Sequence, residues 1–215
     1  LQAQLEVLNQ AYSGTNADSA SIPSWFKPLF AKSYIRFCLA QRTPGDAPST
    51  GITRTATSST SFTYDDKVKY SSTGGTDSWN TDNYFNVWIC RLGNNLLGYA
   101  TFPDDGNADA QGVVIDYRTL PGGSYQNYNT GKTLCHETGH YFNLYHIWGD
   151  DDGACTGTDY VDDTPNQANS SSGCSSGIKT DKCTPGGNGI LYQDYMDYSY
   201  DNCLIMFTTE QVERM

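Results

Sequence analysis

The sequence predicts an α/β (α+β) fold, in which a small sheet and one central helix precede an irregular, crosslinked second half. Three observations indicate this order. Strand-like apolar segments lie between residues 85 and 120, residues 130 to 143 look helical, and residues 149 to 189 read as loop with three embedded cysteines. A chain of 215 residues suffices for one large domain or for two subdomains around a cleft.

Composition excludes several classes of protein. Asp and Glu number 24 against 13 Lys and Arg, which gives a formal net charge of −11. This charge argues against nucleic acids and anionic membrane surfaces as partners, and it favours cations or basic substrates. Disorder is excluded because 13% of the residues are aromatic. No apolar run approaches the ~18 residues of a membrane span, so we expect no membrane insertion.

Both ends of the chain look helical. Four apolar residues near the start recur at helical spacing on one face: Leu1, Leu5, Leu8 and Tyr12. Such a beginning, without a signal peptide, is expected of a processed or trimmed product. At the other end, Thr208 or Thr209 before Glu210 predicts the capped start of a helix. This helix stops after about one turn, so we expect the natural protein to continue past Met215.

Four segments between the terminal helices resemble strands. Residues 32–40 alternate polar and apolar side chains, as in a strand, and residues 41–61 read as a loop rich in Ser, Thr, Gly and Pro. Residues 85–92 form a near-continuous apolar run, which is typical of a strand buried on both faces. Residues 96–102 and 112–120 are the next candidates, each followed by turn-forming residues.

All three histidines lie in one short stretch, His136-Glu-Thr-Gly-His140-Tyr-Phe-Asn-Leu-Tyr-His146. His136 and His140 are four residues apart, so on a helix their side chains share a face and can bind one small ion. His146 supplies a third ligand if the chain turns back, and Asn143 tolerates the left-handed conformation that such a turn needs. Three histidines with a position left for water are the arrangement of catalytic zinc. Glu137 is then the candidate general base.

A bare His-Glu-x-x-His string also occurs by chance on ordinary helices, but the third histidine at the required spacing favours a metalloenzyme. Together with YMDYSYDNCLIMF at residues 195–207, the motif resembles the metzincins, with their zinc-binding helix and Met-turn. More narrowly, the chain is similar to the pappalysin family of secreted zinc endopeptidases, ulilysin-like and cytophagalysin-like, through FCLAQR, VWICRLGNNLLGYATFP, GVVIDYRTLP, HIWGDDDGAC and DYVDDTPNQ. These segments extend across nearly the whole chain. The departure is Asn143, where metzincins have glycine.

The resemblance implies a twisted mixed sheet and a long active-site helix above a horizontal cleft, with an irregular, disulfide-linked subdomain below it. The first subdomain would comprise residues 1–146, and the second, with a calcium loop and the Met-turn, residues 147–215. The implied protein is a secreted, monomeric zinc endopeptidase that acts on protein or peptide substrates. An extended substrate would pair with an edge strand at Gly98, Tyr99 and Ala100. The alternative for this segment is an ordinary internal strand.

Three roles carry over to single residues. Glu137 would act as base and then as acid, while zinc polarises the scissile carbonyl and lowers the pKa of its water toward ~7. Met196 would be the Met-turn residue, a hydrophobic floor under the metal rather than a ligand. Tyr198 matches a tyrosine that can hydrogen-bond the oxyanion in several metzincins. The alternative for Tyr198 is a packed surface tyrosine.

Seven cysteines point to an oxidising compartment. Four of them lie in the loop-rich second half, where the sequence alone allows three pairings. The resemblance implies two disulfides, Cys155–Cys183 and Cys174–Cys203. Cys38 and Cys90 lie in two predicted strands and are either paired or simply buried. Cys135 precedes the first histidine and faces about 100° away from it on a helix, so we expect a free, packed thiol.

Two acidic loops, residues 149–153 and 159–165, concentrate the oxygen ligands that Ca²⁺ prefers. The plain alternative is a solvated acidic loop, and no EF-hand spacing is present. The resemblance favours calcium in the second loop, with three candidate ligands: Asp159, Asp162 and Thr164.

Pappalysin relatives often hold a basic substrate residue after the scissile bond by an acidic group. The residue directly before Cys203 is Asn202 and not an acid, which argues against a strict arginine preference. Asp201 or the overall negative charge would still favour cationic side chains at this position.

Two other functions remain as alternatives to the endopeptidase. A catalytically silent calcium- or ligand-binding module would hold zinc without hydrolysing peptides. A zinc hydrolase for other substrates would act on small molecules. The three histidines with Glu137 argue against the first, and the edge strand and Met-turn argue against the second.

Overall fold

A computed structural model describes residues 1–103 and 105–215. Its sheet has three strands in the order β1-β3-β2. They are β1 (Val87–Cys90), β2 (Gly98–Ala100) and β3 (Val113–Asp116). Strand β1 runs parallel to β3, whereas β2 is antiparallel to it. The sheet is therefore mixed, as predicted, and β2 lies at one edge.

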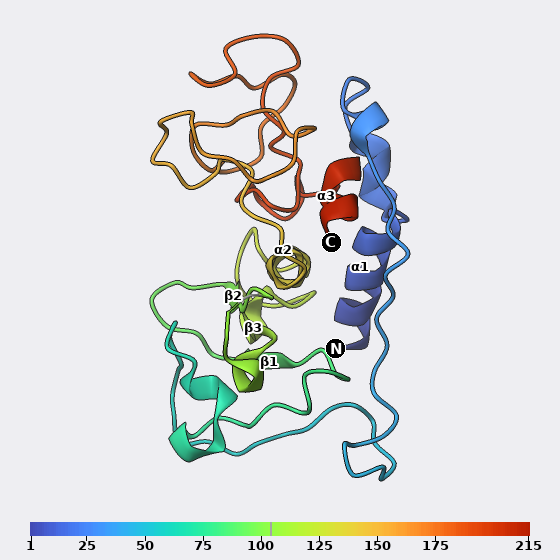
Figure 1. The fold of residues 1–215 in the computed structure, drawn as a ribbon, viewed down its shortest axis with the longest axis vertical. Coiled ribbons are helices and arrows are strands. Elements are labelled where there is room, and N and C mark those ends of the chain that lie inside the picture. Colours follow the sequence, from blue (N-terminus) through green and yellow to red (C-terminus); the bar gives the residue numbers. More distant parts are fainter. Residues whose placement is uncertain (104) are drawn as a thin grey trace.

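Three α-helices accompany the sheet: α1 (Gln2–Ser13), α2 (Lys132–Tyr141) and α3 (Thr209–Arg214). Short 3₁₀ helices span Ala17–Ser21, Lys27–Leu29, Lys67–Lys69, Ser71–Thr73, Ala108–Ala110 and Tyr117–Thr119. In Figure 1, α2 lies at the centre, between the sheet and the C-terminal loops, with α1 and α3 along one side. Every residue of α2 from Lys132 to His140 is buried. None of the helices in the described ranges is long and apolar enough to cross a membrane.

The main apolar core joins the elements that hold α2. Buried residues of this core come from α1, β3, α2 and the segment after residue 190: Leu8, Tyr12, Val113, Ile115, Leu134, Met196 and Phe207. All four residues of β3 are buried, as expected for the central strand. The sheet, α1 and the segment after residue 190 therefore fix the position of α2.

Local sequence explains where the terminal helices begin and end. Helix α1 ends at Gly14, whose φ of 60° is left-handed, and a Cβ there would meet Phe30 and Lys32 at 2.8 Å. Helix α3 begins after Thr208, whose hydroxyl accepts the Gln211 N–H while the Gln211 side chain accepts the Thr208 N–H. This capping box identifies Thr208, rather than Thr209, as the N-cap.

One strand prediction was wrong, and another was right in its position but not in its burial. Residues 32–40 are extended but form no strand, because α1 supplies their hydrogen bonds: Asn9 pairs with both backbone groups of Phe37, and Ser33 donates to the Tyr12 carbonyl. The apolar run at residues 85–92 does form a strand, β1, but it is not buried on both faces, since Ile89 is 37% exposed.

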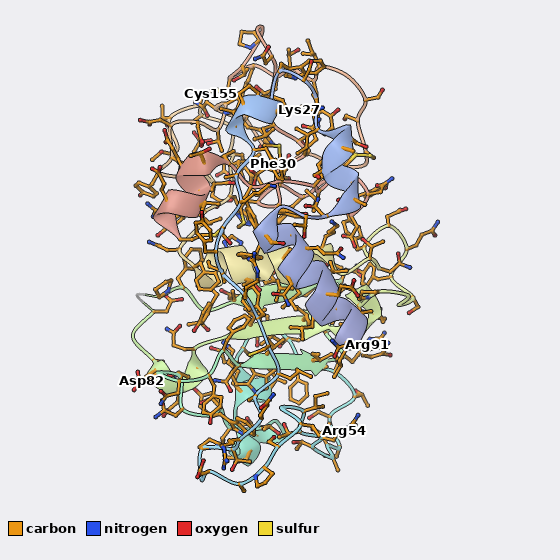
Figure 2. The ribbon with its side chains drawn as sticks, turned by 90° about the vertical axis from the view of Figure 1, so that its right-hand side faces the viewer. Lys27, Phe30, Arg54, Asp82, Arg91 and Cys155 are labelled. Carbon is orange, nitrogen blue, oxygen red and sulfur yellow. A yellow bond between two sulfur atoms is a disulfide. The ribbon has the colours of Figure 1, made fainter. Side chains whose placement is uncertain are left out.

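Residues 149–207 contain no helix or strand. Two disulfides crosslink this part, Cys155–Cys183 and Cys174–Cys203, which are the pairs that the resemblance implies. The other three cysteines are free thiols: Cys38 is exposed, Cys90 half-buried and Cys135 buried. Cys38 and Cys90 are thus not paired, and Cys38 is not buried. Cys155 and Arg54 lie toward opposite ends of the long axis (Figure 2).

Candidate active site

The histidine cluster is built by α2 and the turn that follows it. His136 and His140 lie one helical turn apart on α2, which ends at Tyr141. Asn143 then adopts the predicted left-handed conformation, with φ 70°. The turn is closed by hydrogen bonds from Asn143 N to the His140 carbonyl and from Leu144 N to the Gly139 carbonyl, both 2.9 Å. This reversal returns His146 to the helix face.

The three imidazoles converge on one point. The Nε2 atom of His140 lies 3.1 Å from Nε2 of His136 and 3.1 Å from Nε2 of His146. One ligand atom from each of the three histidines lies within 4.8 Å of the other two. In the described ranges, no other set of three His, Cys, Asp or Glu side chains has such spacing. The prediction that these histidines come together is therefore confirmed.

Each ring has its Nδ1 atom against an oxygen. His136 Nδ1 lies 2.7 Å from the Tyr195 carbonyl, and His140 Nδ1 lies 2.8 Å from the Leu144 carbonyl. His146 Nδ1 instead lies 2.9 Å from the carboxylate of Asp150. Each Nδ1 therefore carries the proton, and each Nε2 presents its lone pair to the centre of the cluster.

The chemistry of this donor set fits zinc. Burial, and then the proximity of the other rings, lowers the pKa of His136 well below its usual range. Burial lowers the pKa of His140 to about 3 and also lowers that of His146. The rings are thus neutral, as metal ligands must be. Nitrogens bound tetrahedrally to zinc at 2.0–2.1 Å would be about 3.4 Å apart, close to the separations in this cluster.

The side chain of Glu137, on α2, lies against the edge strand β2. This side chain is 7% exposed, and burial raises its pKa to about 8. A Cβ at Gly98 would lie 2.8 Å from Glu137 Cγ and 3.0 Å from Oε1. Glycine at position 98 therefore lets β2 approach the carboxyl group of Glu137 closely.

Aromatic rings and the Met-turn surround the cluster. Trp148 stacks on His146 with ring centroids 4.1 Å apart. The Tyr198 ring lies 5.0 Å from that of His146, and burial followed by the charge of Glu137 raises the pKa of Tyr198. Tyr198 is nevertheless 47% exposed, so it lies at the rim of the cluster. Met196 is fully buried against Gly139 of α2.

The candidate substrate residues lie in different surroundings. Gly98, Tyr99 and Ala100 are β2, an edge strand and not an internal one. Asp201 is 2% exposed; its Oδ2 accepts hydrogen bonds from Thr130, but its buried Oδ1 has no partner among the described residues. Asn202 is exposed.

The candidate calcium residues are only partly brought together. The Thr164 hydroxyl donates to Asp159 Oδ2 at 2.6 Å, and both residues are buried. Burial raises the pKa of Asp159 to about 6. Asp162 is exposed, and its backbone N–H donates to Glu210.

Sequence reasoning missed two residues that touch the cluster, Trp148 and Asp150. Both follow His146 closely, and Asp150 is four residues after it. That spacing would suggest a contact in a helix, but this part of the chain is a turn, so no periodicity indicated the contact.

Comparisons with known proteins agree with this geometry. The peptidase M43 family model, described as pregnancy-associated plasma protein-A, matches residues 67–215. An extracellular metalloprotease of Arthroderma benhamiae is 38% identical over 222 residues, which cover 100% of this chain and 63% of that protein. One of Neurospora crassa is 45% identical over 60% of this chain and 46% of that protein. The chain thus spans less than two thirds of these relatives.

Solved structures give the same result for the fold. Mature mirolysin of Tannerella forsythia in complex with a cleaved peptide superposes with a TM-score of 0.97 and 46% identity, over 99% of this chain and 81% of that one. Mirolysin in complex with a compound designated "compound 9" matches equally well. The fold is therefore that of a metzincin. The chain belongs to the peptidase M43, or pappalysin, family of metalloproteases.

Proposed function

We propose that this protein is a secreted zinc endopeptidase that hydrolyses peptide bonds in extended protein substrates. One observation carries the proposal: three neutral imidazole nitrogens converge on one point, and Glu137, from the same helix, lies with its carboxyl group against the edge strand β2. An edge strand can pair with an extended peptide through backbone hydrogen bonds. Secretion is supported by the extracellular relatives and by the two disulfides.

In the mechanism, His136, His140 and His146 would hold the metal through Nε2. Bound zinc would supply a Lewis acid and a water of lowered pKa. Glu137 takes a proton from the attacking water and passes it to the leaving amine. Tyr198 keeps its proton and donates a hydrogen bond to the developing oxyanion. Met196 supports the helix from below.

The test is digestion of an unfolded protein by the zinc-loaded wild type, beside Glu137→Ala, with sequencing of all product termini. We expect the wild type to cut and Glu137→Ala to bind zinc without cutting. Tyr198→Phe should lower kcat and leave KM unchanged if the hydroxyl acts only on the oxyanion. A zinc-loaded wild type that cuts nothing would instead support a silent binding module.

We also propose that the enzyme favours a basic residue directly after the scissile bond, with Asp201 as the recognising acid. The buried Oδ1 of Asp201, without a partner in the described parts of the chain, supports this role over the exposed Asn202. Asp201→Asn should lower the preference for arginine over norleucine about tenfold. Asn202→Ala is the matched control. The opposite result, with Asn202→Ala alone changing the preference, would assign the role to Asn202.

Two structural proposals accompany the catalytic one. Residues 1–146 and 147–215 would form the upper and lower subdomains of the cleft, in a monomer. Calcium would bind at Asp159 and Thr164, with Asp162 or nearby carbonyls completing the shell. The close pairing of two buried oxygen groups at Asp159 and Thr164 supports the second proposal.

A further inference from the structure

A cavity of about 270 Å³ lies beside β2, on the far side of that strand from the histidine cluster. One water takes about 30 Å³ in the liquid, so the cavity has room for a long side chain. The residues that matter here are Tyr64, Asp66, Lys69, Tyr99 and Asp105. Tyr99 follows Gly98, the residue in contact with Glu137, so the cavity begins one residue along the strand from the active site.

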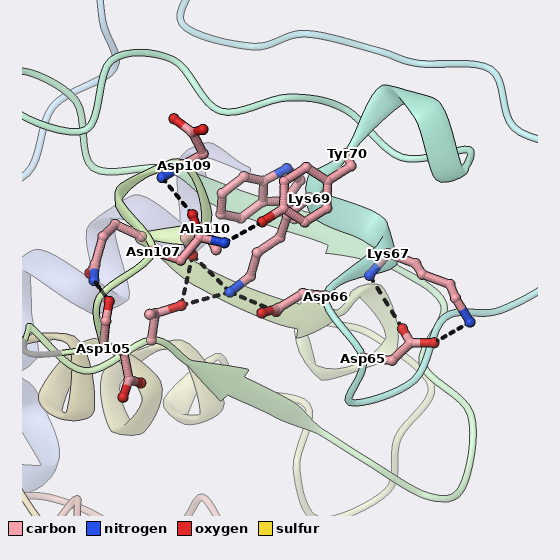
Figure 3. A network of polar contacts seen from close by, with 12 residues as sticks. Asp65, Asp66, Lys67, Lys69, Tyr70, Asp105, Asn107, Asp109 and Ala110 are labelled. Carbon is pink, nitrogen blue, oxygen red and sulfur yellow. Dashed lines mark hydrogen bonds and ion pairs between the residues drawn. The ribbon is translucent and has the colours of Figure 1, made fainter.

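The charges around the cavity leave one carboxylate without a cation. Lys69 is 1% exposed, and its three N–H donors are all used: they bond Asp66 Oδ1 at 2.8 Å, Thr101 Oγ1 at 2.6 Å and the Ala110 carbonyl at 2.8 Å (Figure 3). Lys69 therefore has no donor left for an anionic ligand. Asp66 is neutralised by Lys69, whereas Asp105 forms no ion pair with any described residue.

A buried hydroxyl group also faces the cavity. Tyr99 is 6% exposed, and its hydroxyl has no hydrogen-bond partner in the described parts of the chain. Burial, and then the charge of Asp66, raises the pKa of Tyr99, so the phenol stays neutral. A buried polar group without a partner is costly unless a ligand or water completes it.

The walls suit the apolar stem and flat head of a cationic side chain. The rings of Tyr64 and Tyr99 meet edge to face with centroids 4.8 Å apart, and Tyr64 is largely exposed. Aromatic faces attract ammonium and guanidinium groups. A metal ion fits less well, because no carboxylate cluster in the described ranges has metal-ligand spacing.

The geometry points to a second specificity subsite in this cavity, which binds a lysine or arginine side chain of the substrate at a position not adjacent to the scissile bond. This inference rests on the proposed peptidase function. The charged head would donate to Asp105 and to the Tyr99 hydroxyl, and its stem would pack on the exposed ring of Tyr64.

The register of β2 supports that placement. Gly98 and Ala100 face α2 and the main core, whereas Tyr99 belongs to the smaller core on the opposite face of the sheet. A peptide extended along this edge also alternates its side chains between the two faces. Every second substrate residue beside β2 would therefore point toward the cavity, on the face opposite to the residue that Asp201 is proposed to recognise.

The experiment uses a set of peptides with one cleavable bond and neutral residues elsewhere. Arginine, lysine or norleucine is placed in turn at each position except the one directly after the scissile bond. The readout is the ratio of kcat/KM for arginine over norleucine at each position. The variants are Tyr99→Phe and Asp105→Asn. Asp109→Asn, a neighbouring exposed aspartate whose carboxylate makes no contact with the cavity, removes the same charge as a control.

We expect the wild type to favour arginine about tenfold at one position, since a hydrogen bond to a charged group supplies that much discrimination. The ratio should fall toward one in Tyr99→Phe and Asp105→Asn, stay high in Asp109→Asn, and decrease with salt. Cleavage without cationic preference at any of these positions, or an equal loss in Asp109→Asn, would overturn the subsite and leave the proposed function intact.

A binding measurement separates the two proposals. The zinc-loaded Glu137→Ala protein is titrated in a calorimeter with the arginine peptide and its norleucine counterpart. Arginine-dependent binding that Tyr99→Phe and Asp105→Asn abolish would support the subsite even if no peptide were cut. Equal binding of both peptides would overturn it.

Discussion

Asp150 differs from the other groups that orient the histidines. His136 and His140 are held by backbone carbonyls, which no substitution removes, whereas His146 is held by a side chain. The carboxylate of Asp150 lies 2.9 and 3.0 Å from Nδ1 of His146 and is itself more than half exposed. The orientation of the third ligand therefore depends on one replaceable residue.

We predict that Asp150→Ala weakens zinc binding about 10- to 100-fold, because outer partners of metal ligands typically contribute that much. Zinc affinity is measured by competition with a chromophoric chelator. The side-chain oxygen in Asp150→Asn can still accept a hydrogen bond from Nδ1–H, so the zinc affinity of this variant should lie between those of Asp150→Ala and the wild type. Asp152→Ala removes the same charge two residues away as a control; an equal effect there would mean that only the general negative charge matters.

The ligands themselves could be predicted from sequence, but their supports could not. The spacing of His136 and His140 is a local property of a helix, and Asn143 signalled the turn. Asp150 and Trp148 reach the cluster only because of the path of the chain after that turn. Three aspartates follow one another from Asp150 to Asp152, and the sequence gave no sign of which carboxylate would face His146.

At the scale of elements, α2 and the Met-turn are fitted to each other at one glycine. A Cβ at Gly139 would overlap the sulfur of Met196, which is fully buried. The same segment supplies the Tyr195 carbonyl that holds His136, and Asp194 accepts the Met196 N–H at 2.7 Å. A displacement of Met196 would thus reach the first zinc ligand.

We predict that Gly139→Ala lowers the free energy of unfolding by about 1–3 kcal/mol, the usual cost of overpacking a core. Alanine is favoured over glycine in a helix by up to about 1 kcal/mol, but here the clash outweighs that gain. Urea unfolding of a double-mutant cycle with Met196→Ala measures the coupling. The cost of Gly139→Ala should shrink in the Met196→Ala background; an unchanged cost would exclude contact with the sulfur as its cause.

The elements with local signals were predicted best. The apolar face of α1 and the N-cap of α3 follow from residues near in sequence: Leu8 and Tyr12 for the face, and Thr208 for the cap. Residues 32–40 have the alternation of a strand, yet Asn9 and the Tyr12 carbonyl supply their hydrogen bonds. Alternation predicts an extended chain, but it carries no information on whether another strand lies beside it.

At the scale of the whole molecule, two different kinds of stabilisation meet at α2. The sheet and residues 190–207 share packed apolar cores, whereas residues 149–189 rely on crosslinks and on aspartates that bind backbone groups. The Asp151 carboxylate alone accepts hydrogen bonds from four N–H groups, those of Gly153, Ala154, Thr156 and Gly157. Acidic residues in these loops are therefore partly structural, which is why composition alone could not separate loop support from calcium binding.

Asp159 is the residue at which these two explanations lead to different results. Its carboxyl group is buried with the Thr164 hydroxyl, and burial raises its pKa to about 6, so a nearby cation would offset the cost of burying its charge. We predict that CaCl₂ at about 100 times its dissociation constant stabilises the zinc-loaded protein by about 2.7 kcal/mol. For a chain of this size, that is a rise in Tm of roughly 5–10 °C.

The measurement is a thermal scan at neutral pH with zinc held constant, comparing CaCl₂ with MgCl₂ at equal ionic strength. Asp159→Asn and Thr164→Val should abolish the response to calcium, because each removes an oxygen ligand that Ca²⁺ prefers. Asp152→Asn, which changes the charge of the neighbouring acidic loop only, should retain the response. If calcium and magnesium act alike on the wild type, the Asp159–Thr164 pair is an internal hydrogen bond that supports its loop, as Asp151 supports the loop before it.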